Sequence, residues 1–326
     1  TLAWNTYRHF EIYYATSGIG AVCHTVNPRL FPGQIAYIVN HAEDAVLFVD
    51  LTFLPLVEQW ADQMKGVQRI IIMTGARTMP KTTLKDAICY EELVEGASDE
   101  LDWPEFDENT ASSLCYTSGT TGNPKGVLYS HRSTMLLAYA VCLPDAFSIA
   151  AQDCVLPVVP MFHVNAWGLP YASALAGAKL VLPGPKLDGA SLHELIETEG
   201  VTATAGVPTV WMSLLQYLAD TGKRIDGLKR VVIGGSATPR AMIETFNERY
   251  GTEVIHAWGM TEMSPIGTIN RPKYGMEGET PTQKYDRQSK QGRPIFGVEM
   301  KIVDDENREL PHDGKAFGDL RVRGPW

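Results

Sequence analysis

The most informative stretch of the chain reads Tyr116-Thr117-Ser118-Gly119-Thr120-Thr121-Gly122-Asn123-Pro124-Lys125-Gly126-Val127. It directly follows a predicted apolar strand, and residues 117–126 contain four hydroxyl side chains, three glycines and one cation. Glycines allow the backbone to approach phosphate oxygens closely, while hydroxyls, backbone amides and the Lys125 ammonium supply donors and charge. The stretch therefore predicts a phosphate-binding loop, with a polar surface turn as the alternative. It is not the usual P-loop, because Gly126 follows the lysine where a P-loop has Ser or Thr.

On both sides of this loop, short β-branched runs alternate with longer amphipathic segments, which is typical of an α/β sheet covered by helices on both faces. The expected strands are Ala45–Asp50, Arg69–Met73, Ser112–Tyr116, Val155–Val159, Lys179–Leu182, Thr202–Ala205, Arg230–Ile233 and Val254–His256. The expected helices are Thr6–Tyr14, Pro32–His41, Leu56–Met64, Arg132–Val141, Leu192–Glu199, Thr209–Leu218 and Arg240–Tyr250. Because strands and helices alternate, we expect an α/β fold of stacked, mostly parallel sheets flanked by helices.

The character of the sequence changes near Asn270. Lys, Arg, Gly, Pro and Gln are frequent in residues 271–293, which predicts a long exposed loop. Short alternating stretches at Val298–Val303 and Asp319–Arg323 then predict a small antiparallel β region near the C-terminus.

The overall charge favours small-molecule partners. The 326 residues carry a formal net charge of -10, and 44% of them are hydrophobic. A negative field does not attract phosphate polymers, so we expect no nucleic-acid partner. The sequence has no run of about 18 uncharged apolar residues, so we expect no transmembrane segment and a cytoplasmic location.

The cysteines and histidines give no sign of a metal site built from protein ligands alone. The cysteines are widely spaced, at Cys23, Cys89, Cys115, Cys142 and Cys154, and we expect buried reduced thiols. The eight histidines are scattered and form no HExxH motif. Any divalent cation is therefore expected to arrive with a phosphate ligand.

The phosphate-binding stretch resembles the signature of the adenylate-forming superfamily, which includes acyl-CoA synthetases, firefly luciferases and peptide-synthetase adenylation domains. Three further segments match this superfamily in the same order: Ile233-Gly234-Gly235-Ser236-Ala237-Thr238-Pro239, Ala257-Trp258-Gly259-Met260-Thr261-Glu262 and Phe317-Gly318-Asp319-Leu320-Arg321-Val322-Arg323-Gly324-Pro325. The resemblance covers the whole chain and is closest to the fatty acyl-CoA synthetases, the ligases of medium- and long-chain fatty acids.

The resemblance implies a nucleotide site built from three of these motifs. The residues expected to bind ATP or AMP are Thr117, Ser118, Gly119, Thr120, Thr121, Gly122, Lys125, Gly235, Ser236, Ala237, Trp258, Gly259, Met260 and Thr261. Trp258 offers a flat ring on which a purine can stack, and the Glu262 carboxylate suits Mg²⁺ that phosphate also holds. A core tryptophan beside a surface Thr-Glu pair is the alternative. The residues expected to act in catalysis are Lys125, Thr261, Glu262 and His163.

The segment Pro160-Met161-Phe162-His163-Val164-Asn165-Ala166-Trp167 resembles the acyl side of the site. In fatty acyl-CoA synthetases a tryptophan in the place of Trp167 gates the acyl tunnel. The expected substrate pocket comprises His163, Trp167, Val207, Pro208 and Gly259. An aromatic-rich core segment is the alternative. Amino-acid-activating relatives place an Asp in this region, and none lies between Met161 and Tyr171, which disfavours an amino acid substrate.

The resemblance implies ATP-dependent activation of a carboxylic acid to acyl-AMP, followed by transfer of the acyl group to coenzyme A, with Mg²⁺ as the cation. We expect a medium- or long-chain fatty acid, or a related aliphatic or thioether acid, and leave homodimerisation open. A catalytically silent nucleotide- or acyl-binding module is the alternative from another class. Luciferase-like oxidation would need an aromatic heterocyclic substrate, to which nothing in the sequence points.

The resemblance also implies a division of the chain. We expect a partial first α/β subdomain at 1–110, a nucleotide-binding α/β subdomain with the acyl pocket at 111–270, and a loop and β-rich end of the large domain at 271–326. In the family a ribose-binding Asp, a hinge and a catalytic lysine follow the position of Trp326. We therefore expect a fragment without the small C-terminal lid domain, which binds ATP or acyl-AMP weakly and turns over poorly.

Overall fold

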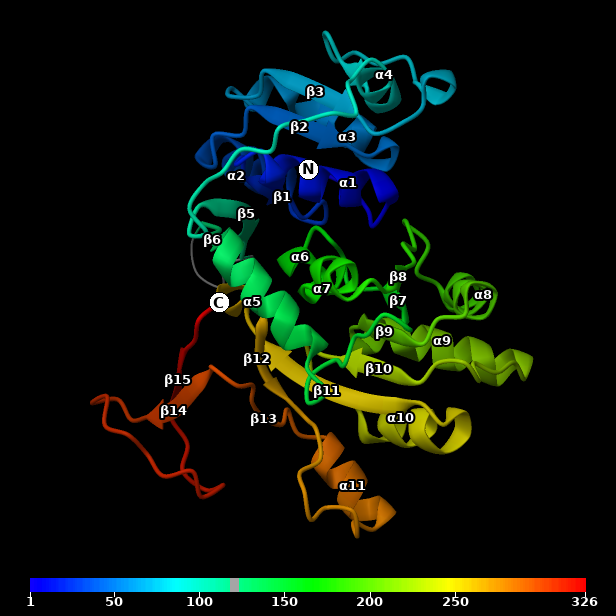
Figure 1. Cartoon of the computed structure of the whole chain (residues 1–326), viewed down its shortest axis with the longest axis vertical. Helices are drawn as coiled ribbons and strands as arrows, with labels where there is room; N and C mark the ends of the chain where they lie inside the picture. The colour runs from blue at the N-terminus through cyan, green and yellow to red at the C-terminus, as the bar shows by residue number, and fades with distance from the viewer. Residues whose placement is uncertain (118–122) are drawn as a thin grey trace.

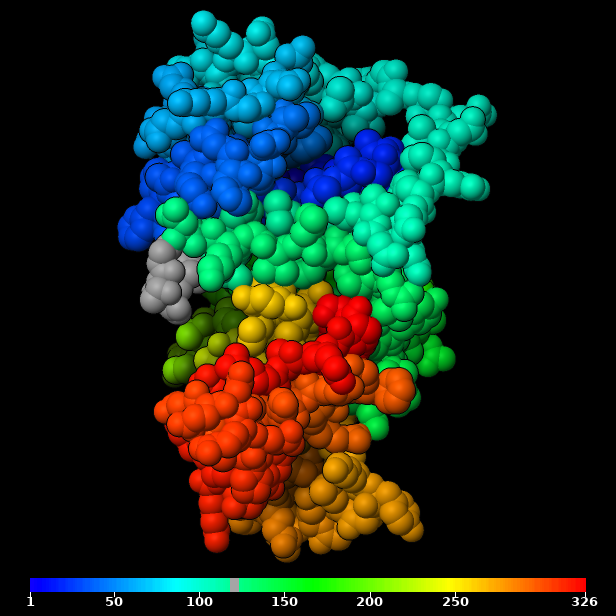
Figure 2. Space-filling model, turned by 90° about the vertical axis from the view of Figure 1, so that its left-hand side faces the viewer, coloured from blue at the N-terminus to red at the C-terminus, as the bar shows by residue number. Residues whose placement is uncertain are grey.

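The computed structural model describes residues 1–117 and 123–326, which form α/β layers stacked along the long axis of the molecule (Figure 1). The space-filling view shows light-blue and cyan residues at one end of this stack and the orange and red C-terminal residues toward the other (Figure 2). Every strand and helix predicted above overlaps one in the structure, so the predicted α/β class is confirmed. None of the described helices combines the length and the hydrophobicity that crossing a bilayer would require.

The largest sheet has seven strands in the order β13-β12-β11-β10-β9-β7-β8. The bounds of these strands are β7 (Cys154–Pro157), β8 (Lys179–Leu180), β9 (Ala203–Gly206), β10 (Arg230–Ile233), β11 (Glu253–Gly259), β12 (Ile266–Ile269) and β13 (Arg293–Pro294). Strands β8, β7, β9, β10 and β11 pair in parallel, whereas β12 and β13 pair antiparallel at one edge. The carboxyl ends of the five parallel strands therefore meet along one edge of the sheet.

Three smaller sheets complete the β structure of residues 1–117 and 123–326. One joins β2 (Val46–Val49), β3 (Arg69–Ile72) and β4 (Ile88–Cys89) in parallel. Another places β5 (Ala111–Tyr116) between a parallel neighbour, β1 (Cys23–Thr25), and an antiparallel one, β6 (Gly126–Ser130). The last pairs β14 (Glu299–Val303) with β15 (Asp319–Arg323) antiparallel, which confirms the predicted small β region.

Helices connect and cover these sheets. Their bounds are α1 (Tyr7–Gly18), α2 (Pro32–His41), α3 (Leu54–Trp60), α4 (Tyr90–Glu95), α5 (His131–Cys142), α6 (Val164–Trp167), α7 (Leu169–Ala176), α8 (Gly189–Glu199), α9 (Pro208–Thr221), α10 (Arg240–Glu244) and α11 (Pro281–Gln288). Short 3₁₀ or π turns lie at Leu51–Phe53, Ala61–Gln63, Ala76–Thr78, Thr245–Arg249 and Thr261–Met263.

Alternate residues of the large sheet enter two different hydrophobic clusters. On β10, Val231 and Ile233 pack with α8, α9 and α10, whereas Val232 packs with the side that holds α5 and α7. Successive side chains of a strand point to opposite faces, so this division means that helices cover both faces of the sheet. A third cluster surrounds β2 and β3 with α2 and α3.

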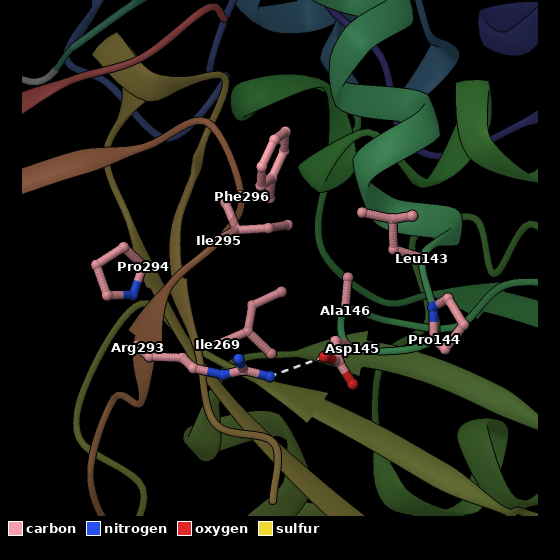
Figure 3. A pocket seen from close by; sticks show the side chains of 9 residues that line it. All are labelled: Leu143, Pro144, Asp145, Ala146, Ile269, Arg293, Pro294, Ile295 and Phe296. Carbon is pink, nitrogen blue, oxygen red and sulfur yellow. Dashed lines mark hydrogen bonds and ion pairs between the residues drawn. The ribbon is translucent and has the colours of Figure 1, made fainter. Parts of the chain in front are cut away.

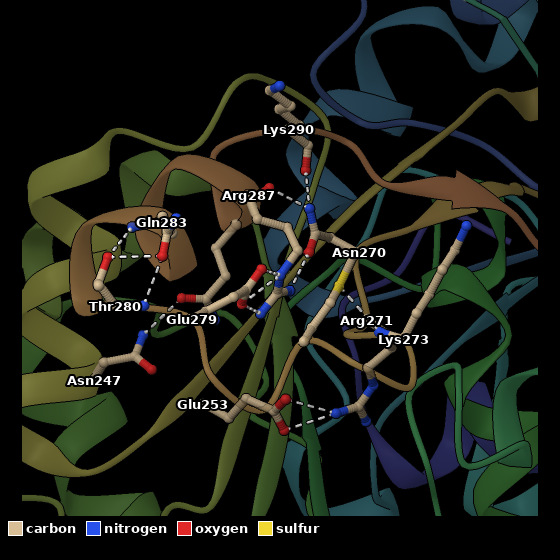
Figure 4. Close-up of polar contacts among 12 residues, drawn as sticks. Asn247, Glu253, Asn270, Arg271, Lys273, Glu279, Thr280, Gln283, Arg287 and Lys290 are labelled. Atoms are coloured by element: carbon tan, nitrogen blue, oxygen red, sulfur yellow. Dashed lines mark hydrogen bonds and ion pairs between the residues drawn. The ribbon is translucent and has the colours of Figure 1, made fainter.

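The predicted loop at 271–293 is in part wrong, because it contains α11. Thr280 caps this helix by accepting a hydrogen bond from the Gln283 backbone, and Pro281 occupies its first turn. The side-chain amide of Asn270 donates one hydrogen bond of 2.7 Å to the carbonyl oxygen of Lys290, and its Oδ1 accepts one of 2.9 Å from the Arg287 guanidinium (Figure 4). The prediction missed this helix because its sequence is almost entirely polar. Capping and buried polar contacts hold the helix against β11.

A buried ion pair holds the amino ends of three neighbouring strands together. Asp153, just before β7, pairs with Arg230 at the start of β10. Its carboxylate also accepts from Thr202 Oγ1 at 2.7 Å, just before β9, and from the Ala150 amide at 2.9 Å. Burial raises the pKa of Asp153, but these hydrogen bonds and Arg230 outweigh it, so the pKa lies below its ordinary value.

Replacement of Asp153 by Asn should lower the free energy of unfolding by about 3 kcal/mol at neutral pH, because Arg230 would lose its buried counter-ion. Because the folded-state pKa of Asp153 is depressed, its contribution is present above the unfolded pKa and is lost as pH falls through the folded pKa. The difference in urea-unfolding free energy between the parent and Asp153→Asn should therefore shrink in acid.

The matched control is Asp226→Asn, which removes an exposed pair with Arg224. This change should cost less than about 1 kcal/mol. Equal losses in the two variants would show that the ion pair before β7 has no special structural role.

Candidate active site

A pocket of about 240 Å³ opens at the carboxyl ends of the parallel strands. Its lining residues are Phe147, Val159, Pro160, His163, Val164, Trp167, Val207, Gly234, Gly235, Ala257, Trp258, Gly259, Met260, Thr261, Pro265 and Ile266. Most of them follow β7, β9 and β10 or lie at the end of β11, and open parallel sheets bind ligands at this edge. Eight residues predicted from the sequence line the pocket: His163, Trp167, Val207, Gly235, Trp258, Gly259, Met260 and Thr261.

Glycines let the backbone pack closely around Trp258, near the end of β11. A Cβ atom on Gly267 of β12 would stand 2.7 Å from the Trp258 ring, and one on Gly259 would stand 1.8 Å from the Pro265 carbonyl oxygen. Both distances are shorter than van der Waals contact, so these positions need glycine in this backbone geometry. The indole is thereby packed against β12 while it also lines the pocket, where a purine could stack on it.

The tryptophan that is expected on the acyl side, Trp167, reaches the same pocket from the segment after β7. Trp167 is 8% exposed, and a Cβ on Gly234 would stand 3.1 Å from Cη2 of its ring. Gly234 and Gly235 follow β10 in the motif segment of residues 233–239, in which Gly235 is expected to bind the nucleotide. The two predicted halves of the site, for the nucleotide and for the acid, therefore share one cavity.

The strands that flank the predicted phosphate loop lie beside the Thr261 segment. The Thr117 amide donates to the Lys125 carbonyl oxygen at 2.9 Å and continues the β5–β6 hairpin. On β6, the Tyr129 hydroxyl donates to the Thr261 carbonyl oxygen at 2.6 Å. The hairpin and the Thr261–Glu262 segment are thus neighbours, which the nucleotide site requires.

Tyr129 remains a hydrogen-bond donor over the ordinary pH range. Burial, together with the neighbouring Cys115 and Glu262 groups, raises the pKa of its phenol well above the ordinary value. A protonated phenol can donate to a carbonyl oxygen at any pH where the protein is folded. Sequence reasoning missed this contact, because nothing in the local pattern around Tyr129 indicates its partner 132 residues later.

His163 is exposed at the edge of the pocket, next to Pro160, whose carbonyl accepts from the His163 amide at 3.0 Å. Desolvation by the surrounding protein, and then the positive charge of Arg29, lower the pKa of its imidazole. The neutral ring is therefore favoured near neutral pH, and it can either donate or accept a hydrogen bond.

The remaining predicted residues lie beside the pocket or outside the described residues. Ser236 and Ala237 are exposed and follow Gly235, while buried Pro208 begins α9 directly after Val207. Thr117 and Lys125 stand at the two ends of the hairpin, and Glu262 is exposed next to Thr261. The predictions for Ser118, Gly119, Thr120, Thr121 and Gly122 fall on residues 118–122, which the structure does not describe.

Several lining residues were not predicted. Phe147, Val159, Pro265 and Ile266 line the pocket without belonging to the residues assigned to it from the sequence. Phe147 lies between α5 and β7 and reaches the pocket only through the packing of the large sheet. Its sequence neighbourhood gives no signal for this position.

A second pocket of about 350 Å³ lies elsewhere on the surface (Figure 3). It is lined by Leu143, Pro144, Asp145, Ala146, Ile269, Arg293, Pro294, Ile295 and Phe296, and Arg293 pairs with Asp145 at 2.8 Å. Although it is larger, it contains no residue of the motifs described above. We therefore place the site in the smaller pocket.

The whole chain is also similar in sequence to known proteins. The chain is 55% identical over 326 residues to a 3-methylmercaptopropionyl-CoA ligase of Ruegeria lacuscaerulensis, and the alignment covers 100% of the chain and 60% of that protein. It is 54% identical to a medium-chain-fatty-acid–CoA ligase of Ectopseudomonas oleovorans, again over 100% of the chain and 60% of the relative. The chain thus spans about 60% of the length of these curated relatives.

The fold also matches solved structures. The anthranilate CoA ligase AuaEII in complex with anthranoyl-AMP superimposes with a TM-score of 0.85 at 23% sequence identity, over 99% of this chain and 59% of that one. At this identity the similarity concerns the fold alone. The family described as AMP-binding enzyme, however, matches residues 1–326, the full length of the chain. On this evidence, the chain belongs to the AMP-binding enzyme family.

Proposed function

We propose that this chain provides the nucleotide and acid sites of an ATP-dependent acid–CoA ligase. The supporting observation is the single pocket that Trp258 and Gly235 share with Trp167 and Val207. A site that forms an acyl-adenylate must hold a carboxylate next to a nucleotide, and this pocket joins the residues expected for each. The relatives named above as CoA ligases support the second step, transfer of the acyl group to coenzyme A.

In the proposed first step, a carboxylate oxygen attacks the α-phosphorus of ATP, the bond to the β-phosphate oxygen breaks, and pyrophosphate leaves. The main difficulty is that an anion approaches a polyanion, so positioning and charge neutralisation dominate. Lys125 supplies a cation at the end of the hairpin, and Thr261 supplies a hydroxyl in the pocket. In the second step, the sulfur of coenzyme A attacks the acyl carbon, the bond between that carbon and the phosphate oxygen breaks, and AMP leaves while the thiol proton is released to solvent.

The Glu262 carboxylate is suited to hold Mg²⁺ together with phosphate oxygens. It is an exposed hard oxygen donor directly beside Thr261, and its segment contacts the phosphate hairpin through Tyr129. A bound Mg²⁺ would supply positive charge against the phosphates. Glu262 itself would orient that cation on the Thr261 side of the nucleotide.

The acid is proposed to be aliphatic. Among the described residues that line the pocket, His163 is the sole ionisable side chain, and the remaining wall is largely apolar or glycine. Such a wall accommodates an alkyl chain and offers no carboxylate to pair with a substrate ammonium. We propose a medium- or long-chain fatty acid, with a thioether propionate as the second candidate because a 55% identical relative is named a 3-methylmercaptopropionyl-CoA ligase.

The function is tested by acid-dependent ATP–pyrophosphate exchange on the complete protein, with propionate, methylthiopropionate, octanoate and palmitate in parallel. Exchange that depends on one of these acids supports the ligase. Binding of AMP without exchange for any acid would instead support a silent nucleotide-binding module.

We also propose a cytoplasmic location, and size-exclusion chromatography would decide between a monomer and a homodimer.

Replacement of Trp167 by Ala should change the preference among acids more than the affinity for ATP, because Trp167 is the acyl-side wall of the pocket. We expect the ratio of apparent affinities for octanoate and propionate to change about tenfold, whereas ATP affinity stays within about twofold. Exposed Trp103 lies outside the pocket lining, so Trp103→Ala should change neither quantity. A loss confined to ATP affinity would contradict the acyl-side assignment.

Replacement of Glu262 by Gln should reduce the dependence of ATP binding on Mg²⁺, because the amide is a much weaker cation ligand than a carboxylate. In the presence of Mg²⁺ we expect ATP affinity to fall about tenfold and AMP affinity in metal-free buffer to remain unchanged. Isothermal titration calorimetry with and without Mg²⁺ measures both. The exposed carboxylate of Glu277 provides the control, and an equal effect of Glu277→Gln would rule out a specific role for Glu262.

A further inference from the structure

The segment between His163 and Gly168 has an unusual backbone. Val164, Asn165, Ala166 and Trp167 have φ values of 44°, 48°, 50° and 56°, so α6 is a left-handed turn built from non-glycine residues. In this region the Cβ atom of an L-residue crowds the following carbonyl oxygen. Four consecutive residues of this kind persist only where surrounding contacts hold them.

Asn165 supplies those contacts from the middle of the turn. Its side chain is 5% exposed. Its Nδ2 donates to Ser113 Oγ at 2.9 Å, and its Oδ1 accepts from Tyr13 Oη and from Cys115 Sγ, both at 3.4 Å. Asn also tolerates the left-handed conformation better than most L-residues.

The partners of Asn165 belong to elements that matter for the nucleotide side. Ser113 and Cys115 lie on β5, the strand that leads into the phosphate hairpin at Thr117. Tyr13 of α1 also donates to the carbonyl oxygen of Met161, two residues before His163. The side-chain amide of Asn165 therefore connects the segment expected on the acyl side directly to β5, the strand that leads into the predicted phosphate loop.

The residues on either side of Asn165 form the pocket wall. Val164 and Trp167 line the pocket, as does His163 immediately before the turn. Gly168 follows with φ of +77°, and a Cβ there would stand 2.9 Å from Leu137 of α5. The turn is thus confined at its end by α5 and at its middle by β5, while Val164 and Trp167 line the pocket.

We propose that Asn165 is a positioning residue, which fixes the left-handed turn on β5 and thereby sets the place of His163 and Trp167 relative to the phosphate hairpin. This inference rests on the proposed adenylate-forming function. Asn165 does not line the pocket, so it acts on the acid indirectly, through the turn that it holds against β5.

Two variants separate the side-chain role from the backbone role. Asn165→Gly keeps the freedom to adopt positive φ but removes the amide, whereas Ser113→Ala keeps Asn165 and removes the acceptor of its Nδ2. The probe is a non-hydrolysable decanoyl-adenylate mimic, decanoyl-sulfamoyl adenosine, compared with AMP by isothermal titration calorimetry. Thermal unfolding followed by circular dichroism reports whether each variant folds.

Both variants should bind the decanoyl mimic about tenfold more weakly than the parent, because each breaks the buried link that holds the turn. Affinity for AMP should stay within about twofold. Asn247 offers a matched control, because its Nδ2 donates to the Ile243 carbonyl at 2.8 Å outside the pocket lining, and Asn247→Ala should change neither affinity.

Three outcomes would overturn these statements, and they can be told apart. If the parent binds the decanoyl mimic no more tightly than AMP, the proposed function fails and the inference fails with it. If the parent prefers the mimic but both variants bind it like the parent, the positioning role of Asn165 alone is wrong. If the variants lose affinity for AMP and for the mimic to the same extent, Asn165 is merely structural. Should Asn165→Gly not fold, Ser113→Ala decides.

Discussion

The parallel pairing of β7, β9, β10 and β11 is the constraint on which the rest of the structure depends. It places the four segments that follow these strands at one edge, although the strand ends are spread along the chain from Pro157 to Gly259. Asp153, through its contacts with Arg230 and Thr202, holds together the opposite, amino ends of three of these strands, β7, β9 and β10. Because the amino ends of the strands are held together in this way, the segments at the carboxyl ends can contain glycines and strained turns that would otherwise weaken the sheet.

This arrangement divides the pocket between two kinds of wall. The end of β11 and the turn after β10 provide a flat indole and small residues, which suit a nucleotide base and its close backbone approach. The segment after β7 provides His163 and Trp167, which suit the acid. Because both walls rise from neighbouring strands of one sheet, their separation is set by strand spacing rather than by a flexible linker.

Much of this could be predicted from sequence, and most of the exceptions depend on residues that are distant along the chain. The phosphate hairpin, Trp258 and the strand–helix alternation are local patterns, so they were visible in order along the chain. By contrast, α11 was hidden by its polar composition, and the Tyr129–Thr261 contact joins residues 132 positions apart. Phe147 likewise reaches the pocket only through tertiary packing. A contact between residues that are far apart along the chain cannot be predicted from the sequence pattern around either of them.

The left-handed turn at Val164–Trp167 is the clearest case. Each non-glycine residue in this conformation costs roughly 1–2 kcal/mol, so no propensity scale would predict four of them in succession. The cost is offset by tertiary contacts: the Asn165 hydrogen bonds and the burial of Val164, Ala166 and Trp167. The wall of the pocket is therefore built from a conformation that the local sequence disfavours and only the folded sheet can maintain.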